Sequence, residues 1–81
     1  MAFDPAIPHS VLERFPNYKK TITRLFTGNE NFQALCEDHQ RCVEALRYWY
    51  RSQEEVAEAR WDEYNSLLLD LEAEILLRLD E

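Results

Sequence analysis

Two runs of apolar residues at helical spacing, separated by a short polar segment, constrain the fold of this chain most strongly. Intervals of three and four residues place each run on one face of an α-helix. Because the segment between them is short, the two helices are expected to fold back as an antiparallel hairpin. The first run is Phe32, Leu35, Cys36, His39, Cys42, Val43, Leu46, Trp49 and Tyr50, and the second is Ala57, Trp61, Tyr64, Leu68, Leu71, Ile75 and Leu79.

Capping signals give the expected bounds of the two long helices. Residues 27–31 supply alternative N-caps for a helix over about 30–51. The run Ser52-Gln53-Glu54-Glu55 has the form of a capping box and starts a second helix over about 53–79. With Ser52 and Gln53 at the turn, His39 is expected to face Leu68 across the hairpin.

The N-terminal arm, residues 1–28, is predicted to hold short helices. A second capping box, Ser10 to Glu13, predicts a helix over 11–15 that Pro16 breaks or kinks. Another helical piece follows and ends near Gly28, which is expected to adopt the left-handed conformation of a C′ residue. Phe3 and Ile7 are candidates to dock on the helices.

Length and composition fit a single all-α domain over residues 1–81, with the arm followed by the hairpin over 29–81. A chain of 81 residues with one glycine and three prolines leaves little room for a β-meander. No run approaches the roughly 20 apolar residues of a transmembrane helix. The N-terminus lacks the basic start and apolar run of a secretory signal, so we expect a cytoplasmic protein.

The charge is unevenly distributed along the chain, whose net value is −7. Residues 1–28 carry four basic and two acidic side chains, whereas residues 29–81 carry five basic and fourteen acidic ones. An acidic hairpin repels phosphate, so nucleic acid is not an expected partner. The four basic charges of the arm also do not make a membrane-binding helix.

A further apolar stripe on the last helix, formed by Leu69, Ala73 and Leu76, lies off the face that meets the first long helix. A helix that is apolar on two faces needs two partners. The second partner is either the N-terminal arm, a second copy of the chain in a dimeric helical bundle, or a helix of another protein. We name Leu69, Ala73 and Leu76 the outer stripe and predict that it is an interface.

The strongest candidate for a chemical site is Cys36, His39 and Cys42, whose order resembles metal-ligand spacing. In a helix, however, positions six apart lie roughly 10 Å apart between Cα atoms, which prevents a disulfide and hinders chelation of one zinc ion. Buried cysteines also act as small apolar residues, and His39 could set the register of the core. Core packing is therefore the favoured interpretation, with a metal site or a thiol sensor as the alternatives.

No pattern in the sequence predicts an enzyme. The phosphate-binding motifs G-x-x-x-x-G-K-[ST] and G-x-G-x-x-G are both absent from the sequence. The two histidines and two cysteines do not define a catalytic triad by their spacing alone. Carboxylates such as Asp70, Glu72 and Glu74 are spread around the helix, which is typical of a solvated face. We therefore predict no cofactor and no small-molecule substrate.

The run FQALCEDHQRCVEALRYW, followed by ARWDEYNSLLLDLEAEILLRL, resembles a family of short bacterial proteins of unknown function. The shared pattern is C-E-D, then A-L-x-x-W, then E-Y-x-x-L-L, over residues 29–79. The resemblance implies a bacterial all-α hairpin and brings no activity, cofactor or catalytic residue. In that pattern an aromatic residue often follows C-E-D, whereas this chain has His39 there.

Taken together, the sequence predicts a non-enzymatic protein–protein interaction or regulatory module that acts through helical packing, as a homodimer or with a partner helix. The alternative is a thiol- or metal-responsive sensor that uses Cys36, His39 and Cys42. The predicted core is Leu25, Phe26, Phe32, Leu35, Leu46, Trp49, Trp61, Tyr64, Leu68, Leu71 and Ile75.

Overall fold

A computed structural model describes residues 6–80, and all of its regular structure is helical. The elements are α1 (His9–Arg14), a short 3-10 helix η1 (Pro16–Tyr18), α2 (Lys19–Gly28), α3 (Glu30–Arg51) and α4 (Ala57–Leu79). No strand occurs within this part of the chain, so the prediction of an all-α fold is confirmed there. None of the helices between residues 6 and 80 combines the length and apolar character needed to cross a membrane.

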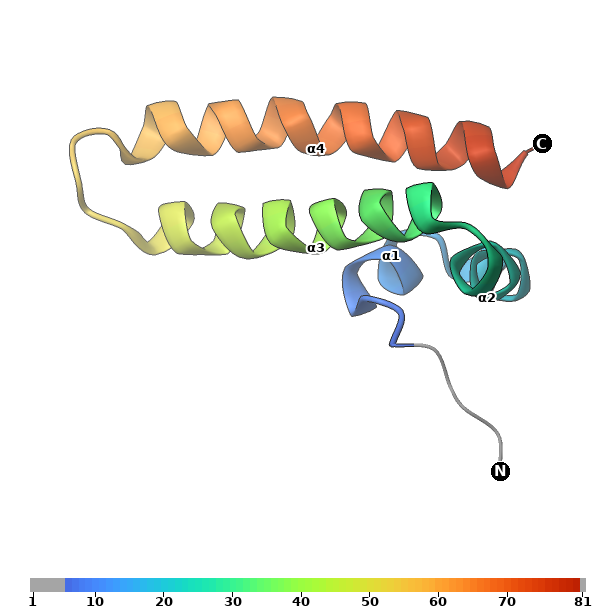
Figure 1. Cartoon of the computed structure of the whole chain (residues 1–81). Helices are drawn as coiled ribbons and strands as arrows, with labels where there is room; N and C mark the ends of the chain where they lie inside the picture. The colour runs from blue at the N-terminus through green and yellow to red at the C-terminus, as the bar shows by residue number, and fades with distance from the viewer. Residues whose placement is uncertain (1–5, 81) are drawn as a thin grey trace.

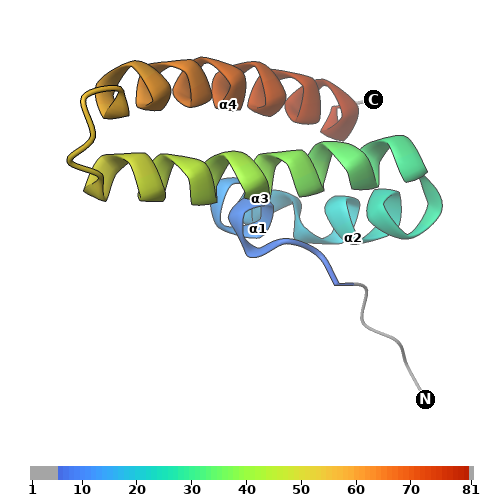
Figure 2. The ribbon, with the colours of Figure 1, turned by 60° about the vertical axis from the view of Figure 1, so that its left-hand side comes forward.

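α3 and α4 run antiparallel side by side, and α1 and α2 pack against α3 on one flank of the hairpin (Figures 1 and 2). From this flank they also reach α4, since Arg14 of α1 bonds Glu72 of α4 at 3.1 Å. Both short helices lie toward the end of the hairpin where α3 begins and α4 ends, which we call the base. The opposite end, around the connection between the long helices, is the tip, and of the described helices it contains only α3 and α4.

The bounds of α3 agree with the sequence, and its cap explains where it starts. The side chain of Asn29 accepts a hydrogen bond from the Phe32 backbone N–H at 3.0 Å. This bond satisfies one of the N–H groups that have no partner within the helix. Asn29 also has an extended backbone, so the chain changes direction at this residue. The preceding Gly28 stays helical, and the prediction that it adopts a left-handed conformation is wrong.

The start of α4 differs from the prediction, because Ser52 does not cap it. The Ser52 hydroxyl accepts a hydrogen bond from the backbone N–H of Glu54, two residues later, at 3.1 Å. This bond forms a local turn instead of a helix cap. The Ala57 N–H then bonds the Glu54 carbonyl at 3.0 Å, and α4 begins at Ala57 rather than near 53. The connection therefore spans residues 52–56.

The longer connection changes the register of the hairpin. His39 bonds Glu72, which lies four positions, about one helical turn, beyond the expected neighbour Leu68. The predicted pairing of His39 with Leu68 is thus displaced along α4. Leu68 and Glu72 lie on the same side of α4, so the predicted face of the helix agrees with the structure. The predicted position of α3 along α4 differs by about one helical turn.

The arm folds into short helices, as expected, although α1 begins at His9 rather than Val11. Pro8 occupies the N-cap position and no side chain caps α1, so the predicted capping box at Ser10 does not form. Pro16 begins η1 and separates α1 from α2. Ile7 packs against the core, and Phe3 lies outside the described residues.

The buried apolar cluster sits at the base and draws on all four α-helices and the residue after α1. Its position explains why the predicted core was only partly correct. Val11, Phe15, Ile22 and Leu79 are buried although they were not predicted as core residues. The cluster comprises Val11, Phe15, Ile22, Phe26, Phe32, Cys36, Ile75 and Leu79, with Leu25 and Leu35 among the residues packed against it.

The predicted core residues nearer the tip are less buried than expected. Tyr50, which belongs to the first apolar run but not to the predicted core, is 81% exposed. Neither α1 nor α2 covers the tip, which accounts for this exposure. Six residues of the predicted core are only half-buried: Leu46, Trp49, Trp61, Tyr64, Leu68 and Leu71.

We expect Ile75→Ala to destabilise the fold by about 2–5 kcal/mol, because it removes a fully buried side chain and leaves a cavity. Urea unfolding followed by circular dichroism measures this loss. Leu77→Ala, on the exposed side of the same helix, is the matched control and should change stability by less than about 0.5 kcal/mol. Equal losses for the two variants would contradict the observed core.

Candidate functional site

The most concentrated group of chemically active side chains surrounds His39, which is 1% exposed in the middle of α3. Its Nδ1 atom lies 2.7 Å from the Ser10 hydroxyl oxygen in α1, and its Nε2 atom lies 2.9 Å from a Glu72 carboxylate oxygen in α4. The second Glu72 oxygen accepts a bond from the Arg14 Nε–H at 3.1 Å. We call Ser10, His39, Glu72 and Arg14 the polar network.

The chemistry of the partners determines the proton positions in the polar network. An ionised carboxylate only accepts hydrogen bonds, so the Nε2–H of His39 donates to Glu72. In neutral imidazole the other nitrogen is then an acceptor, and the Ser10 hydroxyl donates to Nδ1. Both ring nitrogens are therefore used by side chains from different helices, which fixes the ring orientation.

A second contact holds α1 beside the histidine. The Ser10 backbone N–H donates to the Gln40 side-chain oxygen at 3.0 Å. This N–H lies in the first turn of α1, where it has no acceptor within the helix. Consecutive residues of α3, His39 and Gln40, thus bind the hydroxyl and the amide of the same serine.

Two members of the polar network contradict the sequence interpretation. Ser10 is not a cap, and Glu72 does not belong to a solvated face, because its side chain is only 13% exposed. Both contacts join residues about thirty positions apart, which local patterns do not reveal. One signal was available: Glu72 precedes the buried Ile75 by three residues, so the two share a face of α4.

A serine, a histidine and a carboxylate that are linked by hydrogen bonds in this order also form the nucleophilic site of many enzymes. The geometry here favours a structural role. Ser10 and His39 are both buried, and the backbone N–H of Ser10 is bonded to Gln40 rather than free to stabilise an oxyanion. The polar network therefore joins α1, α3 and α4 to one another.

The three residues of the predicted metal site, Cys36, His39 and Cys42, all lie in α3 and are buried there. Cys36 and Cys42 are free, buried thiols. Desolvation, assisted by the charge of Glu37, raises the pKa of Cys36 from 9.0 to about 12, and desolvation with Asp38 raises the pKa of Cys42. Thiolates, which bind metals and react with oxidants, are thus disfavoured.

His39 is committed to Ser10 and Glu72. Within residues 6–80, no three His, Cys, Asp or Glu side chains gather as a metal-binding group. These observations favour the packing interpretation, and a metal site at Cys36, His39 and Cys42 stays an untested prediction.

The outer stripe faces away from the seam between the long helices. Leu69 is 58% exposed, Leu76 is 40% exposed, and Ala73 between them is also exposed. The arm packs on α3 and does not cover these residues (Figure 2). Of the occupants that the sequence left open, residues 6–28 of the arm are thus excluded.

Comparisons with models of known protein families, with curated proteins and with solved structures found no match to this chain. The resemblance to short bacterial hairpin proteins therefore stays a prediction.

Ser10→Ala should destabilise the fold by about 1–3 kcal/mol, because it leaves the buried His39 Nδ1 without a donor. Chemical unfolding in urea measures the change. Ser66→Ala removes a hydroxyl from the exposed side of α4 and should stay within about 0.5 kcal/mol. An equal loss of stability in the two variants would mean that the Ser10–His39 hydrogen bond does not stabilise the fold.

Alkylation of the thiols should be slow in the folded protein. At pH 8.5 a thiol with a pKa near 12 holds roughly a thousandfold less thiolate than one with a pKa of 9.0, and the thiolate is the reactive form. We therefore expect iodoacetamide to label Cys36 far more slowly in buffer than in concentrated urea, with the rate rising as the pH rises. Mass spectrometry of each cysteine peptide gives the rates, and fast labelling of folded Cys36 would contradict its burial.

Proposed function

We propose that this protein is a non-enzymatic interaction module that associates with a second copy of itself through the outer stripe. The observation that carries the proposal is the row of exposed apolar side chains on α4, which no described part of the chain covers. Contiguous exposed apolar surface on a small domain marks an interaction site. Burial of Leu69 and Leu76 against another helix would remove this surface from water.

The residue sizes along the outer stripe suit an antiparallel pair of α4 helices. In such a pair Leu69 lies opposite the partner's Leu76, and Ala73 lies beside the twofold axis, where a small side chain allows close approach. A symmetric pair uses the same patch on both copies, which is the commonest arrangement among homo-oligomers. A helix of 23 residues is about 35 Å long, so the contact has room for more than the three residues of the stripe.

The use made of the reactive side chains supports a non-enzymatic role. Ser10, His39 and Glu72 bond one another between helices, and both thiols are buried. Each of these groups contributes to holding the module together. The apolar surface of α4 is then available for contact with another chain.

We expect the parent protein to be a dimer and Leu76→Glu to be a monomer, because a carboxylate in an apolar contact is desolvated without a partner. Size-exclusion chromatography with light scattering over a concentration series gives the masses. Leu67→Glu is the matched control: Leu67 is 46% exposed, similar to Leu76, and lies on another side of α4. A monomeric parent at all concentrations, or equal effects of the two substitutions, would overturn the proposal.

A further inference from the structure

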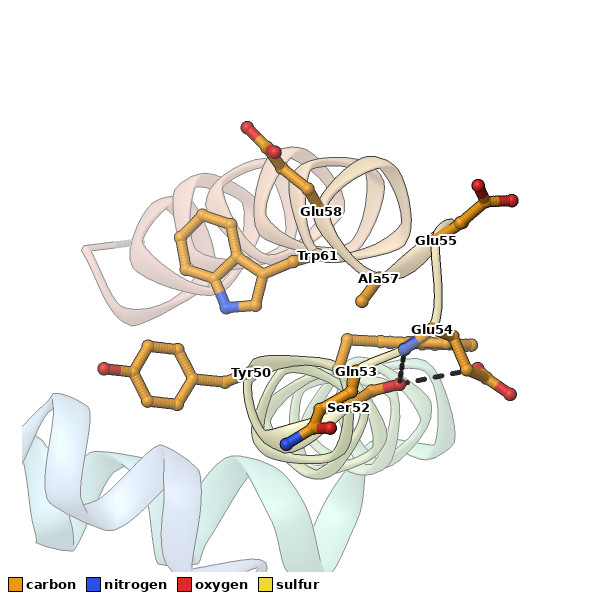
Figure 3. A pocket seen from close by; sticks show the side chains of 9 residues that line it. Tyr50, Ser52, Gln53, Glu54, Glu55, Ala57, Glu58 and Trp61 are labelled. Atoms are coloured by element: carbon orange, nitrogen blue, oxygen red, sulfur yellow. Dashed lines mark hydrogen bonds between the residues drawn. The ribbon is translucent and has the colours of Figure 1, made fainter.

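The tip contains an open cavity of about 500 Å³ that lies between the end of α3 and the start of α4. Its aromatic lining comes from both helices: Trp49 and Tyr50 belong to α3, and Trp61 belongs to α4. Figure 3 shows Tyr50 and Trp61 on the same side of the tip, with a space between their rings. These are the only two tryptophans of the chain, and both line this one cavity.

The cavity carries a strong negative charge. Glu54, Glu55 and Glu58 line it, and no basic side chain does. In Figure 3 the carboxylates of these glutamates lie at the edge of the tip and point away from the rings of Tyr50 and Trp61. Glu54 and Glu55 belong to the connection, and Glu58 belongs to the first turn of α4. None of the ion pairs found among residues 6–80 involves any of the three.

The backbone holds this arrangement in place. The Ser52 hydroxyl and the Glu54 carbonyl accept bonds from the N–H groups of Glu54 and Ala57, respectively, which orders the connection. The C-terminal end of α3 and the N-terminal end of α4 meet here with opposite dipole ends, so their fields oppose each other. The charged side chains that line this cavity are all carboxylates, whereas Arg47 and Arg51 line the neighbouring hollow that shares Ser52 and Glu54 with it.

Aromatic faces together with carboxylates are the groups that bind organic cations. A ring face attracts an ammonium or guanidinium group through its quadrupole, and the attraction adds to that of a nearby carboxylate. The apolar ring surfaces also suit the methylene stem of a long cationic side chain. Three exposed or half-exposed aromatic residues at an acidic tip are thus complementary to lysine.

We propose that the tip cavity binds a lysine side chain on a basic segment of a partner protein. The lysine stem packs against Trp61 and Tyr50, and the exposed carboxylates of Glu54, Glu55 and Glu58 at the edge of the cavity attract the ammonium group. This site is separate from the outer stripe, which begins eight residues beyond Trp61 on α4. Lysine binding therefore does not depend on the proposed dimer.

The two tryptophans provide a direct assay. We expect a capped hexapeptide with two lysines among alanines to change the tryptophan fluorescence of the full chain and to saturate. The same peptide with norleucine in place of lysine keeps the stem and removes the charge, and it should bind far more weakly. No saturable change with the lysine peptide at millimolar concentration, or equal binding of both peptides, would overturn the proposal.

Variants locate the binding site. Trp61→Leu keeps a helix-forming apolar residue and Trp49 as the probe, and it should weaken lysine-peptide binding by about three- to fivefold. Glu58→Gln should weaken it by about two- to fourfold. Asp70→Asn removes the same charge three turns further along α4, beyond the screening length of about 8 Å at physiological salt, and should leave binding unchanged.

Equal weakening by Glu58→Gln and Asp70→Asn would mean that the peptide follows the overall charge, and it would overturn the site, as would parental affinity in Trp61→Leu. Circular dichroism of each variant checks that the helices are retained. The Leu76→Glu variant should bind the lysine peptide as the parent does. A failure of self-association and a failure of lysine binding are therefore distinguished in the same set of proteins.

Discussion

The helices α1 and α2 are too short to cover the whole hairpin, and the rest of the described structure depends on this limit. α2 has 10 residues and α3 has 22, which correspond to lengths of about 15 Å and 33 Å. The short helices therefore cover α3 only at the base, where Ile22 and Phe26 bury apolar surface with Phe32. The base therefore holds four α-helices and the tip only α3 and α4 (Figure 1). At the tip Tyr48 and Tyr50 are exposed, because neither α1 nor α2 reaches that end.

The polar network decides which part of the hairpin the arm covers. Apolar contacts between helices are tolerant of small shifts, whereas His39 accepts and donates in two fixed directions. Ser10 from α1 and Glu72 from α4 meet those two directions, so one residue of α3 positions both neighbouring helices. The described residues leave no buried side-chain nitrogen or oxygen without a partner, which is the condition under which a buried polar group favours one arrangement. His39 thus acts as a positioning residue for the fold.

The sequence predicted which segments are helical better than it predicted which residues of neighbouring helices lie opposite each other. The helical periodicity of α3 is strong, and its bounds at Glu30 and Arg51 were predicted correctly. The start of α4 was misplaced because Ser52 forms a turn with Glu54, and a capping box has the same letters as such a turn. Ser10 and Glu72 were missed as partners of His39 because hydrogen bonds across about thirty residues leave no periodic trace. The exposure of Leu69 and Leu76 agrees with the pattern, since a second apolar stripe on one helix is visible in sequence alone.

The uneven distribution of the buried cluster also has a consequence for motion. Free energies of local opening follow buried apolar contact, so they should be highest where α1, α2, α3 and α4 meet and lowest around residues 52–56. Along α3, amide hydrogens near Cys36 would then exchange with solvent only when the whole domain unfolds. Those near Trp49 would exchange through fraying of the hairpin end. The protein therefore combines a base of high local stability with a tip whose local free energy of opening is lower.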